Sequence, residues 1–308
     1  MSTMKAIRIE QYGGPEVMRY VDIDVPEPKA GEVLVKVAAA GVDPVDYKIR
    51  QGHFLGEDKL PRTLGRELAG TVERMGEGVT GLQPGDTVFG MIGDDGGYAE
   101  YACIAAGNLA RVPQALDLVS AGGVPLAAHT AWQALFDHGG LSAGQRVLIH
   151  GGSGGVGHFA VQFAKAKGAK VYSTGSDKSQ AFIRSLGADR SIDYKQERFE
   201  DVCKDVDVVI DLIGGETQQR SWSVLRAGGI IVSTLEAPEQ DSPDAKGKRG
   251  VHFMAQPNGA QLEEIAALIE EGKVKIKINR TFTLQQADKA QTYLEQEHVE
   301  GKVVLTVV

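Results

Sequence analysis

The chain has 308 residues, a length typical of two domains, with 42% hydrophobic and 24% charged residues, which suits a globular protein with a core. A net charge of −8 argues against a nucleic-acid-binding protein. Two cysteines, Cys103 and Cys203, cannot form a disulfide framework, and no apolar run reaches the ~18 residues of a membrane-spanning helix. The first residues lack the apolar core of a signal peptide. We expect a cytoplasmic protein without membrane or nucleic-acid partners.

Residues 1–121 have the pattern of a β-rich domain. Short strands are predicted over 33–38, 68–73 and 87–90, and turns rich in Gly and Pro separate them. Many short strands with such turns are typical of a sandwich or a partly closed barrel. The last predicted strand, over 302–307, resembles the strands of this domain more than those of the α/β part, so we expect the chain to return to this domain.

From Gly122 onward the pattern changes to an α/β one. Apolar strands are predicted over 147–150, 170–173, 189–192, 206–211, 229–233 and 251–254. Helices over 156–167 and 178–186 separate the first of them, and another is predicted over 261–270. Nearly continuous apolar strands between helices indicate a parallel sheet covered on both faces. The polar segment 236–249 reads as an exposed loop, either disordered or a lid.

A glycine-rich loop follows the strand over 147–150 and opens a helix. Gly151, Gly154 and Gly157 have the spacing that a dinucleotide site needs, with a tight turn, a backbone close to the pyrophosphate and a helix N-terminus facing the anion. The strand, loop and helix context makes this pattern much more specific than the glycines alone. A tight turn that binds nothing is the alternative.

The same loop also fits a serine hydrolase. Gly151 to Gly155 read G-x-S-x-G around Ser153, and Asp211 followed by His252 or His298 would complete a triad in the right order. The loop has more glycine than that pattern needs, and a long β-rich domain before it has no role in a hydrolase. We therefore favour the dinucleotide site.

The end of the second strand indicates which dinucleotide binds. An acid there would hold the ribose 2′-hydroxyl of NAD, whereas a 2′-phosphate needs hydroxyls and a cation. The strand ends at Ser173 without an acid, and Lys178 follows. This favours NADPH, although Asp177 lies between them and is expected to cap the next helix.

Taken together, the chain resembles the zinc-free quinone oxidoreductase branch of the medium-chain dehydrogenase/reductase superfamily. The segments that carry the resemblance are Tyr12–Val17, Asp43–Lys48, Gln83–Val88, Gly97–Tyr101, Gly151–Gly157, Ile210–Gly215 and Gly301–Val304. Phe253, Met254 and the helix after Asn258 look closest to the short reductases that act on quinones and 2-alkenals.

The resemblance implies an α/β fold made of a GroES-like β-rich domain and a Rossmann domain with a doubly wound parallel sheet. The first would span 1–121, completed by about 273–308, and the second 122–272. NADPH would bind between them, and a homodimer is expected. Phosphates are placed at Gly154, Gly155 and Val156, and the 2′-phosphate at Ser173, Lys178 and Tyr194. The nicotinamide end is placed near Asp43, Leu126, Thr130, Leu235, Phe253 and Lys302. Asp43 departs from the family, which usually has Asn there.

We expect no metal. Zinc-dependent relatives have a Cys within 41–48 and a His after the glycine at 65, and here the first segment has no Cys and Arg66 takes the place of the His. The seven histidines show no ligand spacing.

The resemblance implies hydride transfer from NADPH to a small conjugated acceptor, a quinone or an enone. Such a reaction needs mainly proximity, orientation and a few hydrogen-bond donors. Tyr47 is our candidate proton donor, with packing as its alternative role. Lys48, His53 and Arg66 are weaker candidates, and Tyr98 reads as structural. A non-catalytic NADPH-binding protein of the same fold is the remaining alternative.

Overall fold

The computed structural model describes residues 2–54, 56–94 and 96–307. They divide into two compact units. The first consists of Met1–Ala127, Gln256–Gly272 and Ile276–Val308, and the second of Ala128–Ala255 and Lys273–Lys275. The domain limits drawn from the sequence stay a prediction, and they differ from these units mainly in the placement of residues 256–272.

The first unit is built on two β-sheets. The larger sheet has the order β15 (Ile278–Thr283), β16 (Lys302–Thr306), β3 (Glu32–Val42), β5 (Glu67–Met75), β6 (Thr87–Met91) and β8 (Leu109–Arg111), and β7 (Tyr101–Ala105) also pairs with β3. The smaller sheet has the order β2 (Arg19–Asp24), β1 (Thr3–Ile9) and β4 (Arg62–Thr63). Val303 of β16 lies opposite Val42 of β3. The predicted return of the last strand to the β-rich part is therefore confirmed.

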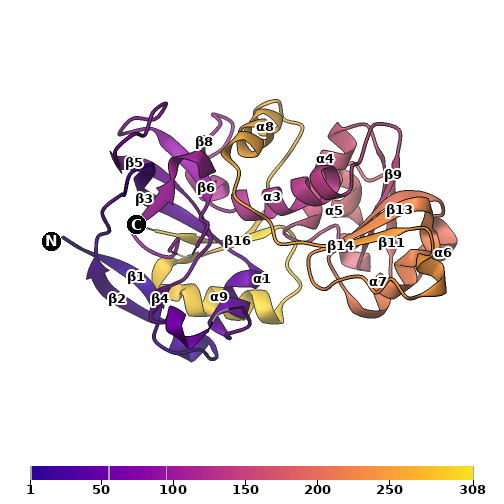
Figure 1. Cartoon of the computed structure of the whole chain (residues 1–308), viewed down its shortest axis with the longest axis horizontal. Coiled ribbons are helices and arrows are strands. Elements are labelled where there is room, and N and C mark those ends of the chain that lie inside the picture. Colours follow the sequence, from indigo (N-terminus) through magenta and orange to yellow (C-terminus); the bar gives the residue numbers. More distant parts are fainter. Residues whose placement is uncertain (1, 55, 95, 308) are drawn as a thin grey trace. The chain divides into compact units, whose positions relative to one another are not determined.

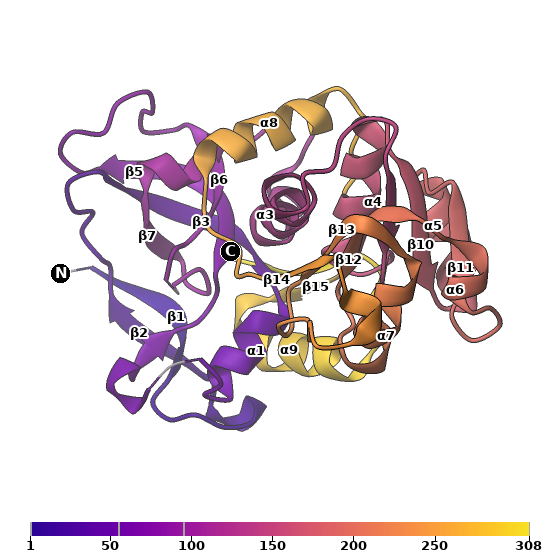
Figure 2. The ribbon, with the colours of Figure 1, turned by 45° about the vertical axis from the view of Figure 1, so that its right-hand side comes forward.

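The helices of the first unit come from distant parts of the sequence. They are α1 (Pro44–Arg50), α2 (Leu118–Ala121), α8 (Gly259–Glu270) and α9 (Ala287–Gln296), with 3-10 turns at Pro15–Val17, Glu57–Lys59, Ala106–Asn108 and Leu284–Gln286. Gly259 lets α8 approach the backbone carbonyls of Gly107 and Leu109. This packing against β8 explains why α8 groups with the first unit. Helices α1 and α9 lie side by side (Figure 2).

The second unit contains a six-stranded parallel sheet (Figure 1). Its order is β11 (Arg190–Asp193), β10 (Lys170–Gly175), β9 (Arg146–Ile149), β12 (Val206–Asp211), β13 (Leu225–Ser233) and β14 (Arg249–His252). In chain order this is 3-2-1-4-5-6, the doubly wound arrangement of a Rossmann fold, so the predicted α/β fold class is confirmed.

Helices cover this sheet. They are α3 (Pro125–Trp132), which begins in the first unit and continues as a π-helical segment (Gln133–His138), α4 (Gly157–Ala166), α5 (Gln180–Ser185), α6 (Phe199–Val202) and α7 (Gly215–Ser221), with 3-10 turns at Asp177–Ser179, Trp222–Val224 and Pro243–Ala245. Trp132 packs edge-on against Phe163 of α4, with ring centres 5.4 Å apart. Leu148 and Val209 of the sheet lie in one buried cluster with Trp222. No helix of the described chain has the length and apolar character needed to cross a membrane.

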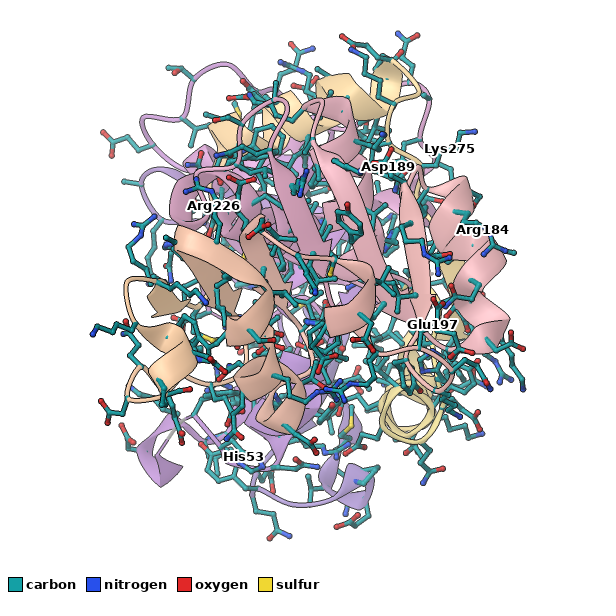
Figure 3. All side chains as sticks on the ribbon, turned by 90° about the vertical axis from the view of Figure 1, so that its right-hand side faces the viewer. His53, Arg184, Asp189, Glu197, Arg226 and Lys275 are labelled. Carbon is teal, nitrogen blue, oxygen red and sulfur yellow. The ribbon has the colours of Figure 1, made fainter. Side chains whose placement is uncertain are left out.

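The sheet edge formed by β11 is polar. Arg184 donates to the Ser191 hydroxyl, Asp189 accepts from the ammonium group of Lys165, and Glu197 pairs with Arg190. Figure 3 shows Arg184, Asp189 and Glu197 on this side of the unit. Segment 236–249 is mostly exposed but contains a 3-10 turn, and Ala245 is buried in the cluster around Trp222. This anchored turn favours an ordered loop over the disordered alternative.

Arg50 connects α1 to α9. Its side chain is fully buried, and it donates to Gly13 O, to Gln291 Oε1 and to both carboxylate oxygens of Glu295. Gln291 is also fully buried, whereas Glu295 is partly exposed, so removing Arg50 leaves a cavity and a buried amide oxygen without its donor.

We predict that Arg50→Ala lowers the free energy of unfolding of the first unit by about 3 kcal/mol. Hydrogen exchange of the α9 amides measures this loss. Arg74→Ala is the matched control, because Arg74 pairs with Glu27 on the surface, and its loss should stay below about 1 kcal/mol. Equal losses in the two variants would contradict a stabilising role for the buried Arg50 side chain.

Candidate active site

The glycine loop of the second unit joins β9 to α4 through close backbone contacts. A β-carbon at Gly157 would overlap the Gly151 carbonyl oxygen, and one at Gly152 would overlap the Ser173 hydroxyl. Gly154, by contrast, has no atom nearer than 3.5 Å to the position of a β-carbon, so this part of the loop is open. A bare, open backbone before the ten-residue helix α4 fits a pyrophosphate. The residues present therefore fit the phosphate part of a dinucleotide.

A series of hydrogen bonds connects Gly151, at the start of the loop, to β10 and α7. The Gly151 N–H donates to Thr174 Oγ1 at 3.2 Å, and the Thr174 hydroxyl lies 3.2 Å from His150 Nδ1. His150 Nε2 lies 2.9 Å from Ser221 Oγ, and the Ser221 hydroxyl donates to Thr217 O at 2.7 Å. A neutral imidazole with its proton on Nε2 satisfies every member of this series. Burial lowers the pKa of His150 to about 4, against an opposing effect of Asp211, so the imidazole is neutral at pH 7.

The residues predicted to hold a 2′-phosphate lie at the ends of β10 and β11. Tyr194 is 56% exposed, and its N–H donates to Gly175 O, which brings β11 to the end of β10. Lys178 is exposed in the turn after β10. Ser173, however, is fully buried, and its hydroxyl donates to Ile149 O at 3.0 Å. In this structure Ser173 supports the strand beneath the loop, and its predicted phosphate contact stays untested.

Two exposed apolar side chains follow β12 and β13, and one of them lies against Gly151 of the loop. Ile213, which the sequence analysis missed, is 55% exposed and its Cδ1 lies 3.2 Å from where a β-carbon of Gly151 would be. Leu235 is 41% exposed, beside Gly214. The predicted residues Thr130 and Phe253 are nearly buried at 8% exposure each, and the Phe253 ring packs on His138. Exposed apolar residues beside a glycine loop suit the flat rings of a dinucleotide.

Ser153 does not have the surroundings of a nucleophile. It is 2% exposed, and no hydrogen bond joins it to Asp211 or His252 in the described chain. The Asp211 carboxylate instead accepts from the N–H groups of Ile213 and Gly214, from Gln218 and from Ser233. His252 is exposed on β14, and His298 belongs to the first unit.

In the first unit the chain brings together a buried cluster of charges. Lys302 of β16 makes an ion pair with Asp43, the residue between β3 and α1, and lies 3.0 Å from Glu67 Oε1 at the start of β5. Glu67 Oε2 accepts the Leu126 N–H at 2.6 Å. Lys302 and Asp43 are 2% and 3% exposed, and Glu67 is fully buried. Three residues that the sequence placed at the nicotinamide end, Asp43, Leu126 and Lys302, are thus linked to one another directly or through Glu67.

Burial and the neighbouring charges shift the pKa values of Lys302 and Glu67 in this cluster. Burial alone would lower the pKa of Lys302, but the charges of Asp43 and Glu67 raise it above its usual value, so the ammonium form persists. Burial raises the pKa of Glu67 well above its usual range, Asp43 raises it further, and Lys302 acts against both. The sequence analysis missed Glu67. An acid at the start of an apolar strand, opposite the small residues 39–41, is the signal that could have revealed it.

Helix α1 carries the candidate proton donor. Asp43 caps its N-terminus and Tyr47 follows four residues later, so both lie on one face of the helix. Tyr47 is half-buried, and burial, followed by the charge of Glu295, raises the pKa of its phenol. Tyr98 is buried and donates to Asp46 Oδ2 at 2.8 Å, which agrees with a structural role. Lys48 and Arg66 are partly exposed, and His53 is exposed.

No group of three His, Cys, Asp or Glu side chains in the described part of the chain is placed to hold a metal ion. Arg66, which takes the place of a zinc-binding His, donates to Gly93 O at 2.9 Å. The sequence prediction of a metal-free site stays a prediction.

Comparison with known proteins identifies the family. Residues 29–114 match the alcohol dehydrogenase GroES-like domain, and residues 186–305 match the zinc-binding dehydrogenase family. The NADPH-dependent alkenal/one oxidoreductase of Arabidopsis thaliana chloroplasts is 37% identical over 316 residues, which are 98% of this chain and 79% of that protein. The solved quinone oxidoreductase of Coxiella burnetii is 37% identical, with a TM-score of 0.92 and complete coverage of both chains.

The chain belongs to the quinone oxidoreductase branch of the medium-chain dehydrogenase/reductase superfamily. Another member of this branch, the Escherichia coli quinone oxidoreductase solved in complex with NADPH, has a TM-score of 0.88 and 27% identity, and the match covers 98% of this chain and 99% of that one. Membership in this branch agrees with the resemblance found in the sequence.

The neutral state of His150 has a consequence for stability. The unfolded chain binds a proton on this histidine near pH 6.5, whereas the folded chain does so only near pH 4. Unfolding therefore takes up a proton between these values, and stability falls as the pH is lowered through this window. At pH 5 we predict that about 2 kcal/mol of stability from this group is lost relative to pH 7.

Urea unfolding followed by tryptophan fluorescence tests this, because both tryptophans, Trp132 and Trp222, lie in the second unit. In His150→Gln the part of the pH dependence due to this group should vanish. His53→Gln, at an exposed histidine of the first unit (Figure 3), should keep the wild-type slope. An unchanged slope in His150→Gln would contradict the neutral imidazole.

Proposed function

We propose that this protein is an NADPH-dependent oxidoreductase that reduces a quinone or an α,β-unsaturated carbonyl compound without a metal. The observation that carries the proposal is the open glycine loop between β9 and α4, which belongs to a chain of the quinone oxidoreductase branch. Relatives are named for NADPH-dependent reduction of alkenals and enones and for quinone reduction.

The residues that would hold the cofactor fall into three groups, one for each part of NADPH. The loop backbone at Gly154, Gly155, Val156 and the helix N-terminus at Gly157 would bind the pyrophosphate. Lys178 and Tyr194, with Ser173 beneath them, would mark the 2′-phosphate end. Asp43, Leu126 and Lys302 would lie at the nicotinamide end, together with Thr130, Leu235 and Phe253.

The chemistry divides between cofactor and chain. NADPH, when bound, supplies the hydride. The chain holds the acceptor beside it, excludes water and provides a proton for the oxyanion that forms on an enone. Tyr47 suits the last task, because its raised pKa keeps the phenol protonated at neutral pH and therefore able to donate.

NADPH oxidation with a panel of 2-alkenals, enones and quinones tests the proposal, with NADH in parallel and with EDTA present. Turnover that prefers NADPH and resists EDTA is expected. NADPH binding without turnover on any acceptor would instead favour the non-catalytic alternative. A protein that binds no NADPH would contradict the assignment of the glycine loop.

We predict that Lys178→Ala weakens NADPH binding and leaves NADH binding unchanged. A charge-assisted hydrogen bond contributes about 1.5–3 kcal/mol, so the Kd for NADPH should rise about 10- to 100-fold. Cofactor fluorescence measures both constants. Lys167→Ala is the matched control, because this exposed lysine follows the far end of α4. Equal losses for both cofactors would contradict a 2′-phosphate contact.

We predict that Tyr47→Phe lowers kcat for an enone about 100-fold with little change in KM, because general-acid catalysis contributes about 10²–10⁴-fold. With a quinone the loss should be smaller, since the product can take its protons from water. Tyr12→Phe is the control: Tyr12 lies in the same unit and its hydroxyl donates to Gly56 O. An unchanged kcat in Tyr47→Phe would leave Tyr47 with a packing role.

We also propose that the protein acts in the cytoplasm and as a homodimer. The homodimer rests on the family resemblance. The cytoplasmic location rests on a sequence with only two cysteines, which suits a reducing compartment. Relatives include chloroplastic and mitochondrial proteins. Light scattering of the purified protein and localisation of a tagged chain test the two proposals separately.

A further inference from the structure

The first unit buries two carboxyl groups beside one ammonium group. Asp43 and Glu67 both contact Lys302, and all three side chains are at most 5% exposed. If both carboxyl groups were ionised, the cluster would have a net charge of −1 away from water, which is strongly unfavourable. Charge balance therefore favours one proton bound within the cluster.

The carboxyl oxygens that lack a hydrogen-bond donor show where such a proton is needed. The carboxyl groups of Asp43 and Glu67 both reach the ammonium group of Lys302, so they lie close to each other. Yet Asp43 Oδ2 and Glu67 Oε1 have no hydrogen-bond donor among the described residues. Ionised carboxylates only accept hydrogen bonds, so a contact between two of them is favourable only when one carries a proton.

The surroundings favour Glu67 as its carrier. Asp43 accepts a direct hydrogen bond from Lys302, whereas Glu67 Oε1 lies 3.0 Å from the ammonium group without hydrogen-bond geometry. The charged groups that act on Glu67 are Asp43, at the end of β3, and Lys302, on β16. At the start of α3 the Leu126 N–H donates to Glu67 Oε2. Gly41 on β3 leaves room for the buried carboxyl group, because a β-carbon there would overlap Glu67 Oε1.

We propose that Glu67 is a positioning residue that carries a proton at neutral pH and donates it to Asp43, so that the Asp43–Lys302 pair is held in a cluster without net charge. Its consequence for the cofactor rests on the proposed function, which puts the nicotinamide end at Asp43 and Lys302. The oxidised nicotinamide ring is cationic and the reduced ring is neutral. Loss of the proton would therefore favour NADP⁺ over NADPH at this place.

The pH dependence of stability tests the proton on Glu67 in the protein without cofactor. Between the unfolded pKa of Glu67 and its higher folded value, unfolding releases a proton, so stability falls as the pH rises. From pH 6 to neutral pH the unfolding constant of the wild type, relative to that of Glu67→Gln, should rise about tenfold per pH unit. Urea unfolding, monitored by hydrogen exchange of the β3 and β5 amides, measures the unfolding constant. Equal pH slopes in the two proteins would overturn the proposal.

A second variant separates the proton from simple packing. In Asp43→Asn, Glu67 loses its negatively charged neighbour while Lys302 remains, and the Asn amide can donate to an ionised carboxylate, so Glu67 should ionise. Glu67→Gln in the Asp43→Asn background should then show no pH slope relative to Asp43→Asn alone. A slope that persists in this background would overturn the role of Asp43.

Infrared spectroscopy supplies a test that needs no variant. At pH 7 the wild type should show the carbonyl band of a buried protonated carboxylic acid, and ¹³C labelling of glutamate should shift it. Absence of a shifted band would overturn the proposal even if Glu67→Gln failed to fold.

The cofactor consequence has its own readout. The ratio of the Kd for NADPH to the Kd for NADP⁺ should rise with pH in the wild type, starting where the stability slope levels off, and should stay flat in Glu67→Gln. A flat ratio in a protein whose infrared band confirms the proton would overturn the placement of the nicotinamide end and leave the protonated Glu67 standing.

Discussion

The buried ammonium group of Lys302 is the point on which the first unit depends most. It lies on the last strand, β16, and contacts acids from the end of β3 and the start of β5, so three strands meet at one charge. An unpaired charge in this position would be strongly unfavourable, and the pairing therefore selects one register of these strands. Leu126, at the start of α3, joins the same cluster through its N–H.

The second unit depends on close backbone packing instead of charge. The loop between β9 and α4 is compact because Gly152 and Gly157 have no side chains, and the neutral His150 beneath it connects β9 to β10 and α7. Both units bury polar groups that contact one another. In the first unit they surround the ammonium group of Lys302, and in the second they surround the neutral imidazole of His150. In the second unit, the loop at Gly154 remains open to a ligand.

Much of this could be predicted from the sequence, because the signals are local. The strand over 147–150 and the helix after it follow from apolar runs and glycines, and they occur at Arg146–Ile149 and Gly157–Ala166. The sequence could not show that Ser173 points inward, because a hydroxyl at a strand end reads the same whether it meets a phosphate or Ile149 O. It also could not show the role of Glu67, whose partners lie 24 residues before it and 235 residues after it. Such contacts depend on the pairing of distant strands.

The passage of the chain between the two units has a consequence for how the protein is made. The chain passes from one unit to the other after Ala127, Ala255, Gly272 and Lys275, so the first unit is assembled from three separate segments. Its larger sheet is complete only when β16 pairs with β3, more than 250 residues after β3 is synthesised. During translation the second unit can therefore fold while the first still has an open strand edge, and a chain stalled before Lys302 would expose that edge of β3 to other chains.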